Sequence, residues 1–239
     1  MILKTEELFK KYKSRMVVNG VSISVRQGEI VGLLGPNGAG KTTTFYMTVG
    51  IVKPYDGRVY FGDNEITDWP MYQRARAGVS YLAQDSSIFR GLSVEDNLMA
   101  VVQMLAVSKS KQQEKVDLLL ENFGLTRFRK QMSVTLSGGE KRRLEIARAL
   151  IIDPKFLLLD EPFVGIDPIT VDDIQKIIRS LKDKGLGILI TDHNVRETLE
   201  IIDRAYIIYE GKILLEGGAK ELLENPKAKK VYLGDNFKM

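Results

Sequence analysis

The sequence contains no cysteine and only one histidine, His193, among its 239 residues. The lack of cysteine excludes disulfide bonds and thiolate metal sites, and it fits a protein of the cytoplasm. No apolar run approaches the roughly 18 to 20 residues that a membrane-spanning helix needs. Acidic residues interrupt the short apolar start of MILKTEELFKKYK, unlike a signal peptide. We therefore expect a cytoplasmic chain without a membrane span of its own.

Internal repeats, low-complexity tracts and linkers rich in Pro, Gly or Ser are also missing. The 35 basic and 31 acidic residues are interspersed and leave a net charge of only +4. This charge alone does not indicate a nucleic-acid-binding protein. One compact unit with an insertion is the simplest organisation.

The spacing of apolar residues changes along the chain. The first sixty or so residues alternate apolar and polar positions, which predicts an antiparallel β layer. From about Leu92 the spacing becomes helical, and Ser93 precedes Asp96 by three residues, as in a capping box. Further on, short apolar strands alternate with helices, one of which repeats isoleucine and leucine on one face over 174–181. This last pattern predicts a parallel sheet covered on both faces, with ligands at the carboxyl ends of its strands.

A glycine-rich stretch, GPNGAGKT, lies between the apolar strand EIVGLL and an expected helix. It matches the phosphate-binding pattern G-x-x-x-x-G-K-[ST] in the context that the pattern requires. Backbone N–H groups of such a loop approach phosphates closely, the lysine reaches the terminal phosphates and the hydroxyl faces Mg²⁺. A simple turn would need neither the lysine nor the hydroxyl. The residues concerned are Gly35, Pro36, Asn37, Gly38, Ala39, Gly40, Lys41 and Thr42.

Two adjacent carboxylates, Asp160 and Glu161, end the apolar strand in KFLLLDEP. Since neighbouring strand residues point in opposite directions, the two carboxylates can take different roles. Asp160 would hold Mg²⁺, usually through water, and Glu161 would polarise the water that attacks in line with the bond being broken. The alternative is a polar strand end before Pro162, which the phosphate loop makes less attractive.

A second pair of glycines opens the expected helix in TLSGGEKRRLEIARAL. A capping box formed by Ser137 and Glu140 would explain those two residues but not Gly138 and Gly139. Consecutive glycines at a helix start have an entropic cost unless something approaches the bare backbone, and a second phosphate is the obvious candidate. His193, just after the apolar run LGILIT, would by itself be read as a surface or core histidine.

The motifs GPNGAGKTT, LSGGE and LLLDEP occur here in the order and at about the spacing of the ATP-binding cassette (ABC) family, which this chain resembles over nearly its whole length. The resemblance implies an α/β P-loop NTPase fold: a RecA-like parallel-sheet core, an N-terminal antiparallel β subdomain and an inserted helical subdomain. We expect the core and β subdomain over about 1–85 and 156–239, and the helical subdomain with the signature motif over about 86–155. The signature of the family most often ends in Gln, where this chain has Glu140.

The resemblance also implies roles for individual residues. Two copies would associate head to tail, so that ATP on the loop from Gly35 to Thr43 of one copy is closed by Ser137, Gly138 and Gly139 of the other. The remaining matches are Tyr12 with the aromatic that stacks on adenine, Gln84 with the glutamine that joins Mg²⁺ to the attacking water, Asp167 with the aspartate that communicates between sites, and His193 with the histidine on the γ-phosphate. The catalytic set is then Glu161, His193, Gln84 and Lys41, and the metal set is Thr42, Gln84 and Asp160. A tyrosine in a β layer also serves packing, and this alternative stays open for Tyr12.

The stretches SSIFRGLSVEDNLMAV, LITDHNVRETL and VYLGDNFKM resemble most closely the ATPase subunits of lipopolysaccharide export transporters. That resemblance implies ATP and Mg²⁺ as cofactors, a homodimer at the cytoplasmic face of the inner membrane, and integral permease subunits that dock at Phe89 and Arg90. For Phe89 the alternative is burial under the helical insertion. The terminal aromatics, Tyr232 and Phe237, are expected to pack on the second subunit or on their own domain. The alternatives for the whole chain are the ATPase of a branched-chain amino-acid importer, a cassette protein that acts on ribosomes or DNA, and an ATP-binding scaffold that does not hydrolyse, against which Glu161 and His193 argue. No nucleic-acid partner is expected.

Overall fold

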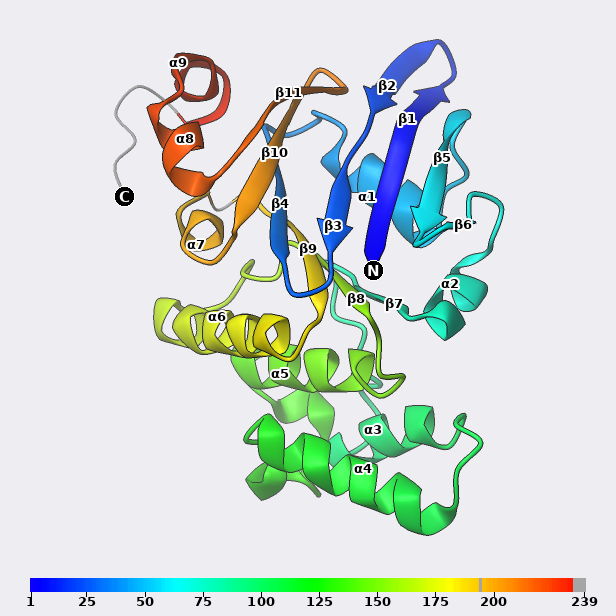
Figure 1. Ribbon diagram of the computed structural model, residues 1–239. Coiled ribbons are helices and arrows are strands. Elements are labelled where there is room, and N and C mark those ends of the chain that lie inside the picture. Colours follow the sequence, from blue (N-terminus) through cyan, green and yellow to red (C-terminus); the bar gives the residue numbers. More distant parts are fainter. Residues whose placement is uncertain (194, 234–239) are drawn as a thin grey trace.

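Two sheets of different type face each other across helix α1 in the computed structural model, which describes residues 1–193 and 195–233 (Figure 1). The first sheet is antiparallel and has the order β2-β1-β5-β6, with β3 paired to β1. Its strands are β1 (Ile2–Tyr12), β2 (Arg15–Val21), β3 (Ser24–Arg26), β5 (Asp56–Phe61) and β6 (Asn64–Glu65). This confirms the antiparallel layer predicted for the N-terminal part of the chain.

The second sheet has the order β11-β10-β4-β9-β8-β7, and its strands run parallel except for β11, which pairs antiparallel with β10. Its strands are β4 (Ile30–Leu34), β7 (Val79–Leu82), β8 (Phe156–Asp160), β9 (Gly187–Thr191), β10 (Arg204–Tyr209) and β11 (Lys212–Gly217). The α/β class and the parallel core predicted from the apolar runs are thus confirmed.

The central strands of the parallel sheet are apolar at successive positions because both of their faces are buried. In β8, Leu157 and Leu159 pack with the helices of one face, whereas Phe156 and Leu158 pack with α1 and the antiparallel sheet. The remaining elements are α1 (Lys41–Val49), α2 (Met71–Ala77), α3 (Val94–Val102), α4 (Lys109–Asn122), η1 (Thr126–Phe128), η2 (Ser133–Thr135), α5 (Gly138–Ala149), α6 (Pro168–Asp183), α7 (Val195–Leu199), α8 (Ala219–Glu224), α9 (Pro226–Ala228) and the π-helical turn η3 (Lys229–Leu233).

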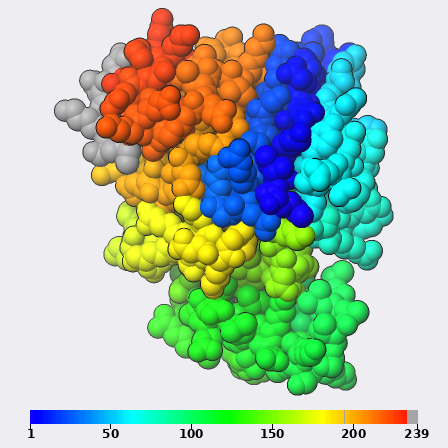
Figure 2. Space-filling model, in the orientation of Figure 1, coloured from blue at the N-terminus to red at the C-terminus, as the bar shows by residue number. Residues whose placement is uncertain are grey.

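Helices α3 and α4 lie below the sheets, with α5 and α6 between them and the parallel strands (Figure 1). In the space-filling view, the green surface of this helical part forms the lower end of the molecule (Figure 2). Ser93 caps α3 by accepting a hydrogen bond from the Asp96 backbone N–H, which is one half of the capping box that the sequence pattern predicts. Among residues 1–193 and 195–233, no helix is long and apolar enough to cross a membrane.

Helix α2 follows from no signal that we used in the sequence, and its Arg74 is almost fully buried (1% exposed). The guanidinium donates hydrogen bonds to the carbonyl oxygens of Met47, Thr48, Thr67 and Trp69, at 2.7 to 2.9 Å. Two of these carbonyls belong to the last turn of α1, where helices leave carbonyl groups without a backbone partner. Arg74 therefore ties the end of α1 to the segment before α2.

Candidate functional site

The phosphate-binding loop connects β4 to α1 in a conformation that depends on glycine. A Cβ atom on Gly35 would lie 2.1 Å from the Ile208 carbonyl oxygen, and one on Gly40 would lie 2.7 Å from that of Val17. Gly40 also has a positive φ of 108° and supplies no side-chain cap to α1. The first N–H groups of α1 are thus left without a capping side chain, at the end of the helix where the dipole favours an anion.

Lys41, the first residue of α1, is 6% exposed, and its ammonium group turns back over the loop. Nζ donates hydrogen bonds to the carbonyl oxygens of Gly35 (2.7 Å) and Pro36 (3.0 Å). Burial lowers the pKa of Lys41, while the carboxylates of Glu161, Asp160 and Asp192 oppose that shift. The geometry places the ammonium inside the curve of the loop and within the field of the carboxylates at the strand ends.

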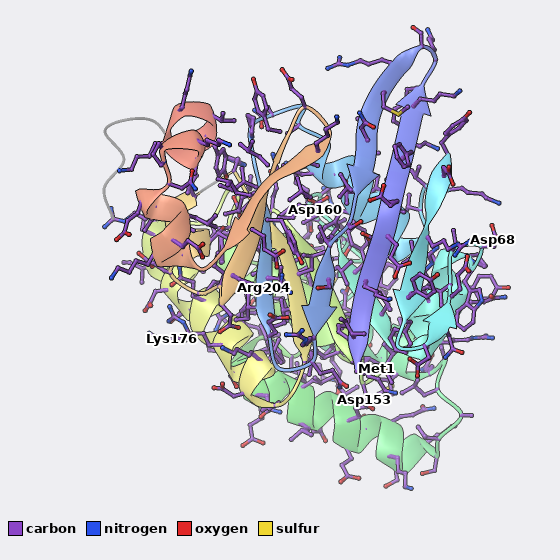
Figure 3. The ribbon with its side chains drawn as sticks, turned by 45° about the horizontal axis from the view of Figure 1, so that its top comes forward. Met1, Asp68, Asp153, Asp160, Lys176 and Arg204 are labelled. Carbon is purple, nitrogen blue, oxygen red and sulfur yellow. The ribbon has the colours of Figure 1, made fainter. Side chains whose placement is uncertain are left out.

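Asp160 ends β8 and is 1% exposed, in the middle of the molecule (Figure 3). Its Oδ1 accepts a hydrogen bond from the Thr191 hydroxyl of β9, whereas its buried Oδ2 has no hydrogen-bond partner within the described part of the chain. Burial raises the pKa of this carboxyl group. A buried carboxylate oxygen without a donor suits a cation, and Mg²⁺ prefers oxygen ligands such as this carboxylate and the exposed Thr42 hydroxyl. The residues present therefore fit a magnesium ion.

Three side chains meet just beyond the ends of three neighbouring strands. The Oε2 atom of Glu161, which follows β8, accepts a hydrogen bond from Nε2 of Gln84 at 2.8 Å, and Nδ1 of His193 lies 3.3 Å from the same oxygen. Gln84 follows β7 and His193 follows β9, so the strand order β9-β8-β7 brings the three residues together. Glu161 has a positive φ of 47°, an uncommon conformation for a non-glycine residue. Its backbone N–H donates to the Thr191 carbonyl at 2.8 Å.

The glycine pair of the signature stretch lies at the start of α5, which Ser137 caps. The Ser137 hydroxyl accepts from the Glu140 N–H, and the Glu140 carboxylate accepts from the Ser137 N–H, so the capping box is complete. Within the described residues, no hydrogen bond engages the backbone N–H groups of Gly138 and Gly139.

Packing inside the fold also requires glycine at position 139. A Cβ atom there would lie 2.0 Å from Cγ2 of Thr170, in the first turn of α6. The Thr170 hydroxyl in turn donates to the carboxylate of Asp167, the N-cap residue of α6, at 2.5 Å. Asp167 and Thr170 thus fix the start of α6 against the start of α5, a contact that spacing along the sequence does not reveal.

This contact predicts that Gly139→Ala destabilises the fold by about 1–3 kcal/mol, as overpacking in a tight core does. Adding Thr170→Ser removes Cγ2 but keeps the hydroxyl that Asp167 accepts from, so the double variant should recover most of the stability. Urea unfolding measures both changes. Gly91→Ala is the matched control, since a Cβ atom at Gly91 would meet no atom within 4 Å. If Gly139→Ala proved as stable as Gly91→Ala, the contact would be less tight than the structure indicates.

The other predicted site residues lie apart from this cluster. Tyr12, at the end of β1, is 49% exposed, with the Lys10 ammonium 5.5 Å from its ring centre. Phe89 is 47% exposed and its ring lies under the Arg148 guanidinium at 4.8 Å, so the alternative of a buried Phe89 is wrong. Arg90 beside it is also exposed. Of the terminal aromatics, Tyr232 packs on its own domain, and Phe237 lies outside the described residues.

Two arginines of α5 join the Phe89 region to the strand ends, and sequence reasoning missed both. Arg142 is 5% exposed and donates to the carbonyl oxygens of Ala83 and Asp160 at 3.1 and 3.3 Å. Arg148 donates to the Ser87 carbonyl and hydroxyl, both at 2.6 Å. A run of basic residues on a helix is usually solvent-exposed, so nothing in the sequence led us to expect these contacts. The signal that could have revealed them is that both arginines share a helix face with Glu145, which is buried.

Comparison with known proteins assigns the family. The ABC transporter family model matches residues 18–164. An uncharacterized ABC transporter ATP-binding protein from Rhizobium meliloti (strain 1021) is 56% identical over 97% of this chain and 86% of its own length. The lipopolysaccharide export system ATP-binding protein LptB of Escherichia coli (strain K12) is 53% identical over 99% of each chain. A crystal structure of the ADP conformation of an ATP-binding cassette of an ABC transporter is 31% identical, with a TM-score of 0.88 over 98% of this chain and 99% of that one. The chain therefore belongs to the ABC transporter family, as one of its ATP-hydrolysing cassettes.

Proposed function

We propose that this chain is the ATPase subunit of a lipopolysaccharide export transporter, working as a dimer on membrane permease subunits at the cytoplasmic face of the inner membrane. The export assignment is supported by relatives named for lipopolysaccharide export at 52 to 53% identity over nearly the whole of both chains. The observation that carries the hydrolytic role is the meeting of Gln84 and His193 at one carboxylate oxygen of Glu161.

ATP binding is assigned to the loop that runs from Gly35 to Thr43. Lys41 would exchange its two loop carbonyls for oxygens of the terminal phosphates, since its ammonium already lies inside the loop. The half-exposed ring of Tyr12 is available to stack on the adenine. When bound, Mg²⁺ held by Thr42, Asp160 and Gln84 would neutralise charge on the phosphates.

Hydrolysis is assigned to Glu161. One oxygen of its carboxylate polarises the water that attacks the γ-phosphorus in line with the bond to ADP, so that ADP and phosphate leave as products. The hydrogen bond from Gln84 fixes that carboxylate. His193, whose side chain is 53% exposed, would contact the γ-phosphate, where a positioned donor stabilises developing charge.

The dimer follows from the start of α5. Gly138 and Gly139 present backbone N–H groups at a helix start, and within the described residues no hydrogen bond engages these groups. A second copy, placed head to tail, would bring these groups to the γ-phosphate. Asp167 then lies in the segment between Glu161 and α6, the position from which it would communicate between the two sites.

The export assignment is tested by purifying tagged Glu161→Gln with ATP from native membranes and identifying by mass spectrometry the integral proteins that accompany it. Permeases for lipopolysaccharide export would support the assignment. Recovery of branched-chain amino-acid permeases would support the ATPase assignment but overturn the assignment of lipopolysaccharide as the cargo. Ribosomal proteins or nucleic acid would overturn the transport role.

Docking of the permease is assigned to Phe89 and Arg90. The Phe89 N–H donates to the Asn97 side-chain oxygen at 2.8 Å, and the Phe89 carbonyl accepts from the Asn97 side-chain NH₂ group at 3.1 Å. These bonds fix the backbone that carries the exposed ring. Phe89→Ala is expected to reduce permease recovery at least tenfold, because aromatic anchors dominate small interfaces, and to leave ATP hydrolysis by the isolated chain within twofold. Tyr55→Ala, at another exposed aromatic, is the matched control. Equal recovery with both variants would remove Phe89 from the interface.

A further inference from the structure

The chain after β11 returns toward the candidate site through Tyr232 of η3. Leu222 of α8 and Ala228 of α9 are buried (2% and 0% exposed) and anchor this segment in the larger core cluster, against which Tyr232 also packs. Helices α8 and α9 lie beside the edge of the parallel sheet formed by β10 and β11 (Figure 1). The segment is therefore part of the folded core, and its tyrosine has a defined position.

The hydroxyl of Tyr232 lies beside two segments of the candidate site. It donates a hydrogen bond to the backbone carbonyl of Asp192 at 3.2 Å. The backbone N–H of Gly35 lies near enough to the same hydroxyl to lower its pKa. Asp192 directly precedes His193, and Gly35 opens the phosphate loop, so this hydroxyl bonds to the peptide before His193 at a point beside the start of the loop.

The surroundings keep this hydroxyl neutral. Burial raises the pKa of Tyr232 well above its ordinary value, the backbone N–H of Gly35 opposes the shift, and the negative charges of Asp192 and Glu161 add to it. A neutral phenol can donate, as the hydrogen bond to the Asp192 carbonyl requires.

Among the described residues, the His193 side chain lies beside two carboxylates. Its side chain is 53% exposed, and its Nδ1 lies 3.3 Å from Glu161 and 3.8 Å from the Asp192 carboxylate. The direction of the ring therefore depends on the peptide that carries it. We propose that Tyr232 is a positioning residue that holds this peptide in register with the phosphate loop, an inference that rests on the proposed role of His193 at the γ-phosphate.

The test compares Tyr232→Phe with Tyr206→Phe in the full chain. Both variants remove one buried hydroxyl and keep the ring, but the Tyr206 hydroxyl bonds to Ser24, in β3, and so serves as the control. Phosphate release measures kcat and KM for ATP, and thermal unfolding measures stability. Hydrogen exchange with mass spectrometry compares residues 33–41 and 188–193 without requiring activity. A third comparison adds Tyr232→Phe to His193→Ala, because residues that act through each other have non-additive effects.

We expect Tyr232→Phe to lower kcat about three- to tenfold, the loss of roughly one hydrogen bond, with KM within twofold and unfolding temperature matching Tyr206→Phe. Exchange should rise in both segments, and the kcat effect should vanish in the His193→Ala background. An unchanged kcat and exchange would overturn the inference while the ATPase assignment stands. An equal kcat loss with or without His193 would also overturn it. If His193→Ala itself left kcat unchanged, the proposed role of His193 would fail first, and the inference with it.

Discussion

Glu161→Gln is expected to lower the rate of phosphate release by about 100- to 1,000-fold while ATP binding remains, because a positioned general base contributes on this scale. Glutamine keeps the shape of the side chain, and its carbonyl oxygen can still accept from Gln84 as the carboxylate does at 2.8 Å. It loses the negative charge that polarises water. ATP should therefore accumulate in the closed dimer, which size-exclusion chromatography with ATP would detect as a stable species.

Glu140→Gln supplies the matched control, since it makes the same chemical change at the last residue of the signature stretch. The Glu140 carboxylate serves the capping box of α5 by accepting from the Ser137 N–H at 2.8 Å. Glutamine can accept the same hydrogen bond, so hydrolysis should stay within a few-fold of the original rate. Turnover by Glu161→Gln at the rate of Glu140→Gln would refute the assignment of Glu161.

Arg74→Ala is expected to reduce the free energy of unfolding by about 3–5 kcal/mol, because it leaves several buried carbonyl groups without a donor. Burial lowers the pKa of Arg74 to about 10, so the guanidinium remains charged at neutral pH and its hydrogen bonds are charge-assisted. Arg74→Lys keeps the charge but cannot reach four carbonyls in a plane, and it should recover only part of the loss. Urea unfolding followed by circular dichroism measures both variants.

Arg76 lies two residues along the same helix and is exposed. Arg76→Ala removes the same type of side chain without unpairing a buried group, and its effect should stay within about 0.5 kcal/mol. An Arg74→Ala variant no less stable than Arg76→Ala would show that water replaces the guanidinium at the end of α1.

Local patterns carried most of the fold. The apolar strands and the amphipathic helix α6 were predictable because the spacing of apolar residues differs between a strand and a helix. In α6, Ile174, Ile178 and Leu181 are buried in the core as their spacing indicates. Helix α2 and strand β11 were missed, since neither has a capping or turn signal that we used. The buried state of Arg74 depends on carbonyls from α1 and the segment before α2. The residues next to Arg74 in the sequence do not predict that it is buried among these carbonyl groups.

The candidate site divides in the same way. Motifs placed Gln84, Glu161 and His193 each at a strand end, but their meeting depends on the order of strands, which local sequence does not specify. The Gly139–Thr170 contact and the buried Arg142 arise from the packing of α5 on its neighbours. Their roles, and those of the remaining motif residues, stay predictions that the experiments above address.

The pairing of β8 with β9 has a consequence for how this chain can change. Asp160 pairs with Thr191 in the backbone ladder, and Glu161 continues it by donating to the Thr191 carbonyl. Because side chains alternate along a strand, inserting one residue in β8 would exchange the directions of these two carboxylates while leaving the composition of the strand almost unaltered. The pairing of β8 with β9 thus sets the direction in which each of the two carboxylates points. Lengthening or shortening the strand by one residue should be tolerated less well than most substitutions of the apolar side chains within it.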